Sequence, residues 1–501
     1  MTRAEKLRLI VSLSVPSILA QISATVMFFI DAAMVGHLGE RATAAIGLVE
    51  TTTWLMGGLG SAANMGFAVQ VAHFIGASDF ESARRVLRQA LVCSLLWSLM
   101  LMTAAIAVHT QLPFWLGGSA DIARDASLYF MLIGVFGVFF QMEGLAGSML
   151  KSAGNMKIPS MLNIMMCVMD VIFNYLFIYV MDMGVVGAAL GTGVAEFITA
   201  GLMLYFLLVR SPMLALVSRC EVRDTRYEIT ESAEEDCNPE ANNSRTSNLE
   251  PRTSYLEPRT SNLAPRTSHL EPRTSKKTPR FSFLLPRIDP AVVNTAFKIG
   301  APMGLQHLLM GGAQIVSTII VAPLGTVAIA ANSLAITVES LCYMPGYGIA
   351  EAATTLVGQG IGAGQRLLTR SFAYMSVALG IAVMTFMGIL MWVFAPELMA
   401  IMSPVSDIIA QGADALRIEA WAEPMFAASI VCNGVFIGAA DTLKPAIMSL
   451  TSMWAVRLTL AATLATRYGL RGVWTAMAIE LTFRGLLFLT RLLRGRWLKK
   501  I

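Results

Sequence analysis

The stretch that decides the fold runs from Leu7 to Gly39 and reads LRLIVSLSVPSILAQISATVMFFIDAAMVGHLG. It is apolar over more than the roughly 20 residues that a helix needs to cross a bilayer. It nevertheless carries one carboxylate, Asp31. An ionised side chain inside a span costs about 2.5–3.5 kcal/mol on insertion scales, so such a residue normally faces a cavity or a partner. The stretch therefore predicts a membrane helix with a functional acid, and Pro16 is a candidate for a kink in it.

The composition extends this prediction to the whole chain. Of its 501 residues, 55% are hydrophobic and 14% are charged, with a mean hydropathy of +0.63. Soluble domains carry about 25% charged residues, so the composition indicates an all-α integral membrane protein. The six cysteines form no CxxC or Cys/His cluster. Neither a disulfide framework nor a zinc site is therefore suggested. No resident cofactor is expected.

Apolar stretches of about 20 residues or more predict twelve transmembrane helices. They lie near 8–37, 44–75, 86–109, 124–149, 158–181, 185–209, 292–322, 328–361, 370–395, 408–438, 444–466 and 471–493.

The basic residues of the short loops predict the orientation in the membrane. They gather before the first span, after the last span and in alternate loops, at Arg3, Lys6, Arg8, Arg84, Arg85, Arg88, Lys151, Lys157, Arg366, Arg370, Lys444, Arg494, Arg496, Lys499 and Lys500. Loops rich in Lys and Arg stay on the cytoplasmic side. We therefore expect a multi-pass protein of the cell (inner) membrane with both termini in the cytoplasm.

The chain repeats itself with a constant offset. Pro16 and Pro302, HLG ending at Gly39 and PLG ending at Gly325, the two IGA motifs at Gly76 and Gly362, and Pro159 and Pro445 are each 286 residues apart. Six spans per repeat bring both copies into the membrane the same way up. The repeat therefore predicts two six-helix lobes related by a pseudo-two-fold along the membrane normal, as is typical of carriers that rock about a central site.

A polar segment separates the two copies. It holds the seven-residue tandem repeat PRTSYLE, PRTSNLA, PRTSHLE and PRTSKKT, and a proline in every repeat forbids a continuous helix. We interpret it as a disordered cytoplasmic linker, with a partner-binding tail as the alternative. The predicted organisation is an N-terminal lobe at 1–210, the linker at 211–290 and a C-terminal lobe at 291–501.

Four polar residues of the first lobe are expected at a similar depth below the outer surface. Asp170 and Asn174 are spaced i, i+4 and share one face of the fifth span. Asp31 lies in the first span and Thr192 in the sixth. Oxygen ligands suit Na⁺, and adjacent desolvated carboxylates favour holding a proton. These four residues therefore predict a site for H⁺ or Na⁺, with hydrogen bonds to neighbouring helices as the structural alternative.

The second lobe lacks this set. At the repeat offset, Asp31, Asp170 and Asn174 become Ser317, Val456 and Leu460. Coupling to a cation is therefore expected to reside in the first lobe.

Other intramembrane acids are weaker candidates. Glu196 follows Thr192 by four residues and belongs either to the cation site or to a structural bond. Glu143 lies in the inner half of the fourth span and is a possible substrate or coupling residue. Glu419 and Glu423 open the tenth span and are expected to be solvated.

Two basic residues of the second lobe lie within spans. Glu480 and Arg484 are spaced i, i+4 and predict an ion pair. Arg457 is expected to pair with a glutamate such as Glu339 or Glu351, between which the sequence does not choose.

Several motifs resemble the multidrug and toxic compound extrusion (MATE) family. In the first lobe these are FFIDAAMVGHLG, VAHFIGASDFESARR and FNYLFIY followed by GVVGAALGTGVAE. In the second they are PLGTVAIAANSLA, MPGYGIAEAATTLVGQGIGAG, GVFIGAADTLKP and GLRGVW. The resemblance implies export of bulky, often cationic, organic compounds in exchange for H⁺ or Na⁺. We also expect the protein to bind no nucleic acid and to be a monomer.

The resemblance also implies roles for individual residues. The acid of the first helix maps onto Asp31, the fifth-helix positions onto Asp170 and Asn174, and a sixth-helix threonine onto Thr192. Many relatives have Asn and then Asp in the fifth helix, the reverse of this chain, so the ion preference stays open. Acidic positions that some relatives use in the seventh and tenth helices are Met310 and Phe426 here.

Three other functions compete with this hypothesis. A lipid or lipid-linked precursor flippase of related lobed architecture would need a large cationic cavity, and a channel would be indifferent to imposed ion gradients. An intramembrane enzyme would need a motif such as HExxH or GxGD, which the sequence lacks. The protein is therefore not expected to be an enzyme.

Overall fold

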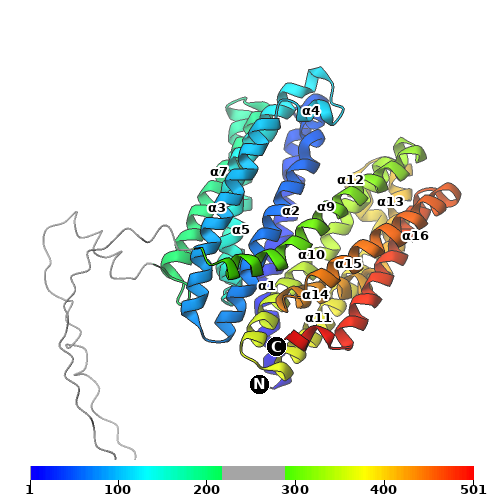
Figure 1. The fold of residues 1–501 in the computed structure, drawn as a ribbon. Helices are drawn as coiled ribbons and strands as arrows, with labels where there is room; N and C mark the ends of the chain where they lie inside the picture. The colour runs from blue at the N-terminus through cyan, green and yellow to red at the C-terminus, as the bar shows by residue number, and fades with distance from the viewer. Residues whose placement is uncertain (1, 217–287, 501) are drawn as a thin grey trace, which may run out of the picture. The chain divides into compact units, whose positions relative to one another are not determined.

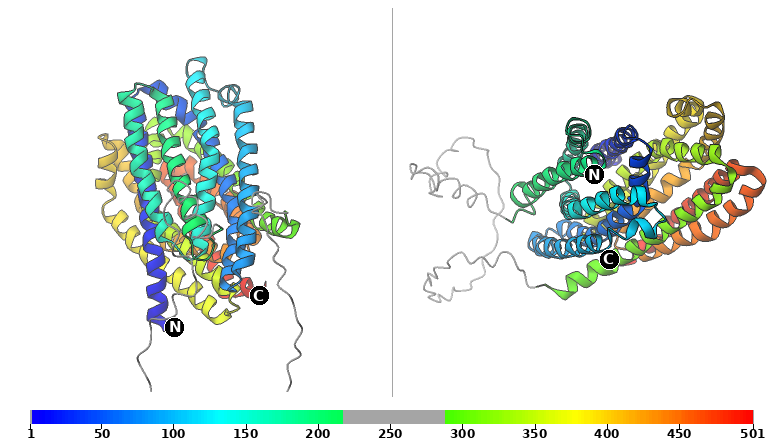
Figure 2. Two further views of the ribbon diagram at one scale, coloured as in Figure 1. Left: turned by 90° about the vertical axis from the view of Figure 1, so that its left-hand side faces the viewer. Right: turned by 90° about the horizontal axis from the view of Figure 1, so that it is seen from above.

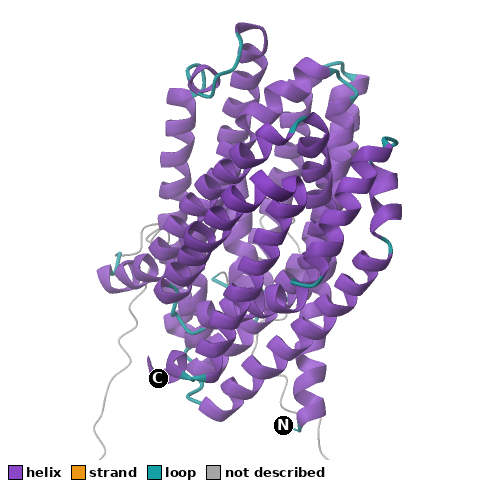
Figure 3. Cartoon of the chain, turned by 90° about the vertical axis from the view of Figure 1, so that its right-hand side faces the viewer, coloured by secondary structure: helices purple, strands orange, loops and turns teal. Residues whose placement is uncertain are grey.

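The computed structural model describes residues 2–216 and 288–500, and within those ranges it contains helices and no strand (Figures 1 and 3). We call residues 2–216 the first half and residues 288–500 the second half. The predicted linker lies outside the described residues, except for its ends at 211–216 and 288–290.

The first half contains seven α-helices and two π-helical turns. They are α1 (Arg3–Gly36), α2 (Glu40–Gly76), α3 (Phe80–Val108), α4 (Leu112–Trp115), α5 (Ala120–Ser152), α6 (Lys157–Tyr175), η1 (Leu176–Val180), α7 (Gly184–Tyr205) and η2 (Phe206–Arg210).

The second half contains eight α-helices and three short helical turns. They are α9 (Pro290–Val321), η3 (Ala322–Leu324), α10 (Thr326–Gly362), α11 (Arg366–Val393), α12 (Ala395–Met402), α13 (Ser406–Ala420), α14 (Glu423–Gly438), α15 (Leu443–Thr451), η4 (Ser452–Arg457), α16 (Leu458–Leu493) and η5 (Arg496–Lys500).

The prediction of an all-helical, multi-span membrane protein is confirmed. Among the described residues, eight helical segments are long and apolar enough to cross a bilayer, and the bent pair α13–α14 makes a possible ninth. The remaining predicted ranges are also helical, at α2 and from α15 through α16. Many Gly, Ser and Thr residues lower the hydropathy of α2.

Local signals place several helix starts. Thr2 and Glu5 form a reciprocal capping box at α1. The Asp79 carboxylate accepts the Ser82 N–H at 3.0 Å and caps the N-terminus of α3. Hydrogen bonds from the Ser82 side chain and backbone lower the pKa of this exposed acid. The last two predicted spans are separated at Gly469, which turns the chain at φ 57° and ψ −138°, a conformation open almost only to glycine.

Both chain termini lie at the same end of the helix bundle, which we call the terminal end (Figures 1 and 2). There α1 packs on α10 and α2 packs on α9. Two glycines let the backbones of α2 and α10 meet. A Cβ on Gly76 would lie 2.0 Å from the Gln359 carbonyl oxygen, and one on Gly362 would lie 1.8 Å from that of His73.

These contacts obey the repeat offset. Gly76 and Gly362 are 286 residues apart, and so are His73 and Gln359. The His73 ring nitrogen Nε2 lies 2.8 Å from the Gly438 carbonyl oxygen, and Gln359 Nε2 donates to the Ser152 carbonyl at 2.8 Å. The two halves therefore contact each other at the terminal end through duplicated elements.

Candidate cation site

Two carboxylates from different helices meet at one amide. Asn174 Nδ2 donates to Asp31 Oδ1 at 3.0 Å and to Asp170 Oδ2 at 3.1 Å. Asp170 is 0% exposed and Asn174 is 2% exposed. Asp170 Oδ1 and Asn174 Oδ1 have no hydrogen-bond partner. These two buried oxygens can accept a hydrogen bond or bind a cation, and the protein supplies no donor to either. Buried polar atoms are normally paired, so this pair requires an explanation.

Close packing of α6 on α7 positions the amide. A Cβ on Gly191 would lie 2.0 Å from Asn174 Oδ1 and 2.8 Å from the Asn174 backbone nitrogen. Glycine at this position is therefore what allows α7 to approach Asn174. The π-helical turn η1 follows at Leu176–Val180, a feature frequent beside functional sites, and Tyr179 Oη donates to the Met34 carbonyl of α1 at 2.8 Å.

Thr192 lies beside Asp170 from α7. All four residues that the sequence predicts for the cation site therefore lie together, on α1, α6 and α7. Two carboxylates, an amide and a hydroxyl form a donor set suited to a small hard cation or to a proton. In the described residues no group of three or more His, Cys, Asp or Glu side chains gathers to hold a metal ion.

Glu196 and Glu143 lie beyond this site. Glu196 is 1% exposed, its Oε2 has no hydrogen-bond partner, and it is within electrostatic range of both Asp170 and Glu143. Asn163 contacts Glu143 when its amide nitrogen faces Glu143 Oε1 at 3.0 Å. Glu196 therefore has both Asp170 of the cation site and Glu143 as electrostatic neighbours.

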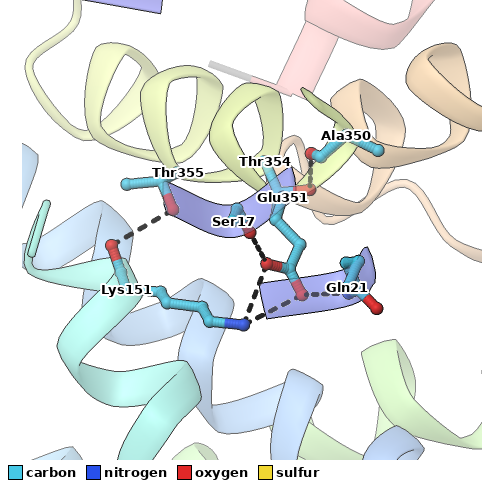
Figure 4. Close-up of polar contacts among 7 residues, drawn as sticks. All are labelled: Ser17, Gln21, Lys151, Ala350, Glu351, Thr354 and Thr355. Atoms are coloured by element: carbon cyan, nitrogen blue, oxygen red, sulfur yellow. Dashed lines mark hydrogen bonds and ion pairs between the residues drawn. The ribbon is translucent and has the colours of Figure 1, made fainter. Parts of the chain in front are cut away.

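A polar cluster joins the two halves, and the sequence analysis did not find it (Figure 4). Lys151 Nζ of α5 lies 2.9 Å from both carboxylate oxygens of Glu351 on α10. Ser17 of α1 donates to the same carboxylate, and Gln21 Nε2 donates to it at 3.3 Å. Glu351 was one of two expected partners of Arg457, and that alternative is wrong. From the sequence alone, Lys151 is identified only as a basic loop residue.

The prediction that Glu419 and Glu423 are solvated is also wrong. Both side chains are 0% exposed, and none of their carboxylate oxygens has a hydrogen-bond partner. The reason is the 60° bend between α13 and α14. Glu419 and Glu423 lie on either side of this bend, and both helices pack on α10.

Several other charged residues of the second half lie close to Glu419. Glu419 is within electrostatic range of Glu339, Glu480 and Arg457. The predicted ion pair of Glu480 and Arg484 is confirmed at 3.3 Å, and Ser452 Oγ donates to Glu480 Oε1 at 2.7 Å. Hydropathy alone could not locate this cluster, because its residues come from four separate helical elements.

Comparison with known proteins agrees with this architecture. The profile of the MatE family matches residues 16–176 and again residues 302–463, and the two matches begin 286 residues apart. A probable multidrug resistance protein NorM of Thermotoga maritima is 23% identical over 497 residues, covering 98% of this chain and 93% of that protein. The protein of the same description from Xylella fastidiosa strain Temecula1 is 28% identical over 199 residues, 39% of this chain and 42% of that one.

Solved structures share the fold. A crystal structure of a MATE protein in complex with MaL6 superposes with a TM-score of 0.82 at 18% identity, covering 99% of this chain and 98% of the other. A MOP superfamily transporter from Pyrococcus furiosus gives a TM-score of 0.81 at 18% identity, covering 99% and 97%. Because the family profile matches both halves over well over half of the chain, the protein belongs to the MatE family of multi-pass membrane transporters and is not an enzyme.

Proposed function

We propose that this protein is a secondary active exporter that exchanges H⁺ or Na⁺ for bulky, often cationic, organic compounds. The observation that carries the proposal is the single amide of Asn174 bound to Asp31 and Asp170 from two different helices. Two carboxylates held this close inside a membrane repel each other unless a proton or a small cation offsets their charge. Asp31, Asp170, Asn174 and Thr192 are the proposed ligands.

Exchange requires that the cation and the organic substrate oppose each other's binding, and such coupling is reciprocal. Glu196 and Glu143 extend from the proposed cation site toward the terminal end, so they are proposed coupling residues. The relatives described as probable multidrug resistance proteins support organic compounds as the substrate class. The proposed units are two transporting lobes, 1–210 and 291–501, joined by a linker at 211–290.

We assign the terminal end to the cytoplasm, because Lys and Arg concentrate in the loops and termini at that end. The contacts of Gly76, Gly362 and Lys151 with the opposite half then close the cytoplasmic side. In this assignment the described state is the one that releases substrate outward and loads the cation.

The test is uptake of ethidium into inverted membrane vesicles under an acid-inside or a sodium-inside gradient. One of the two gradients is expected to drive uptake, which would also identify the coupling ion. Asp31→Asn is expected to abolish that uptake, while Asp121→Asn, an exposed acid of α5, is the matched control and should leave it unchanged. Uptake by Asp31→Asn at the rate of the unmodified protein would rule out the assigned role.

A further inference from the structure

The polar cluster between the halves, Ser17, Gln21, Lys151 and Glu351, concentrates three first-half side chains on one second-half carboxylate (Figure 4). The Lys151 and Glu351 side chains are 21% and 29% exposed. The next turns of α10 continue the contact, because Thr355 Oγ1 donates to the Lys151 carbonyl at 3.2 Å and Gln359 bonds the Ser152 carbonyl. This face of α10 is therefore docked on the end of α5.

The same contact on the other side of the pseudo-two-fold is made without charge. At the offset of 286, the cluster residues correspond to Met303, His307, Ile437 and Met65. Ile437 lies in an apolar cluster with Val69 and Ile299, and Met65 and Met303 pack against it. Closing the halves at this position therefore does not require an ion pair, so the charges need another explanation.

Lys151 has a second acid on its own helix. Glu143 lies two turns earlier on α5, and one of its carboxylate oxygens would lie 3.7 Å from a Cβ placed on the intervening Gly147. The Glu143 carboxylate therefore extends over Gly147 toward Lys151. Long side chains on helices point toward the N-terminus, so the Lys151 side chain is directed toward Glu143. The groups that face Glu143 are Asn163 from α6, Glu196 from α7, and Lys151 and Glu351 from the contact between the halves.

A line of acids connects this position to the cation site. Asp170 and Glu143 both act electrostatically on Glu196, and Lys151 and Glu351 act on Glu143. Negative charge at Asp31 and Asp170 makes each further negative charge along this line of acids less favourable. A cation bound there removes that repulsion.

We propose that Lys151 is a switched partner that pairs with Glu351 while the terminal end is closed and with Glu143 when it opens. The proposal rests on the proposed function for the cation at Asp31 and Asp170. Loading that site leaves Glu143 free to carry its charge and to compete for Lys151, which weakens the bond to Glu351 and releases the halves. With an empty site the competition is absent, and the terminal end stays closed.

The sharpest test replaces the ion pair by the residues of its own symmetry mate, as Lys151→Ile with Glu351→Met. The double variant is expected to fold and to close, since apolar replacement of an ion pair is often neutral or stabilising. It should lose ethidium export by roughly tenfold or more, because closure no longer responds to the cation. The matched control, Met65→Leu with Ile437→Val, should export normally. Export by the double variant at the wild-type rate would show that the pair is only a latch.

Charge reversal is a second way to distinguish a pair that only holds the halves together from a pair that responds to the cation. Lys151→Glu with Glu351→Lys restores an ion pair across the halves but places the new carboxylate beside Glu143. The reversed variant is expected to close the terminal end but not to recover ethidium export. Recovery of export in the reversed variant would overturn the proposal.

Closure is read independently of export. Spin labels at Glu81→Cys and Leu367→Cys, whose side chains are 89% and 87% exposed at the terminal end, report the separation of the halves in a background without the native cysteines. Adding the coupling cation should populate a longer distance in the parent protein but not in Glu143→Gln or in Lys151→Ile with Glu351→Met. A parent protein that exports no dye under either gradient would contradict the proposed function, whereas equal opening of parent and variants would contradict the switch alone.

Discussion

At the scale of single residues, Asn174 holds the site together. Both of its amide hydrogens serve carboxylates, one on its own helix and one on α1. Hydrogen bonds to charged groups contribute about 1.5–3 kcal/mol each. Asn174 therefore determines how far apart Asp31 and Asp170 can move.

Asn174→Ala is expected to separate the two carboxylates and to lower cation-driven ethidium export by about tenfold or more. The protein should still fold, because the helix packing of α6 is unchanged. Export and thermal unfolding of the purified variant would be measured together. A variant with normal export would show that the bridging amide is dispensable.

Gly191→Ala makes the complementary change from the other helix. The added Cβ would lie 2.0 Å from Asn174 Oδ1, so α7 must shift and the amide must turn. We expect a loss of about 1–3 kcal/mol in stability and a marked loss of export. Gly201→Ala on the same helix meets nothing within 4 Å and should be neutral or slightly stabilising in a thermal unfolding assay. Equal behaviour of the two variants would contradict the packing argument.

The sequence predicted the proximity of Asp170 and Asn174 because i, i+4 spacing fixes a shared helix face. Counting residues along the helix also predicts the depth of Asp31 in the membrane, and this stays a prediction. It could not predict that Lys151 binds Glu351, since that pairing depends on how α5 and α10 are rotated about their axes and docked. Nothing in the spacing of either residue contains that information.

At the scale of helices, hydropathy predicted the long elements and missed the short ones. The helices α4 and α12 are four and eight residues long, too short for a signal that needs about 20 apolar residues. The bend between α13 and α14 was missed for a different reason. A span of ordinary hydropathy gives no sign of where its axis breaks, so the burial of Glu419 and Glu423 could not be inferred.

Gly469 makes the turn in the last helical run, and its backbone conformation is strained for any other residue. Gly469→Ala is expected to lower stability by about 1–3 kcal/mol, although a Cβ there meets nothing within 4 Å. The control is Gly311→Ala, which also meets nothing but lies inside the regular helix α9. Comparing the two melting temperatures isolates the backbone effect from side-chain packing, and identical melting temperatures would refute it.

At the scale of the whole molecule, the halves meet through duplicated glycines and diverged side chains. The repeat offset predicted the duplicated part, because landmarks such as Gly76 and Gly362 kept their identity. It did not predict the polar cluster, which has no counterpart at the symmetry-related position. Lys151 and Glu351 correspond to Ile437 and Met65, and only the docked halves show that the two charged residues face each other.

Gly362→Ala is expected to push α10 away from α2, because its Cβ would lie 1.8 Å from the His73 carbonyl oxygen. Spin labels on Glu81→Cys and Leu367→Cys should then report a longer distance even without the coupling cation. Gly36→Ala, at the far end of α1 with nothing within 4 Å, serves as the control. An unchanged distance in the Gly362 variant would show that the two backbones are not in contact at this end.

The matched bonds of His73 and Gln359 have an evolutionary consequence. A tandem gene duplication leaves a constant offset of this kind, and an ancestor of half the length would have assembled as a parallel homodimer through these same bonds. In a homodimer every substitution appears twice, so a lysine and a glutamate could not have been confined to one of two equivalent positions. Fusion into one polypeptide removed that restriction. One of the two equivalent contacts could then acquire Lys151 and Glu351, while the other kept the apolar Ile437 and Met65.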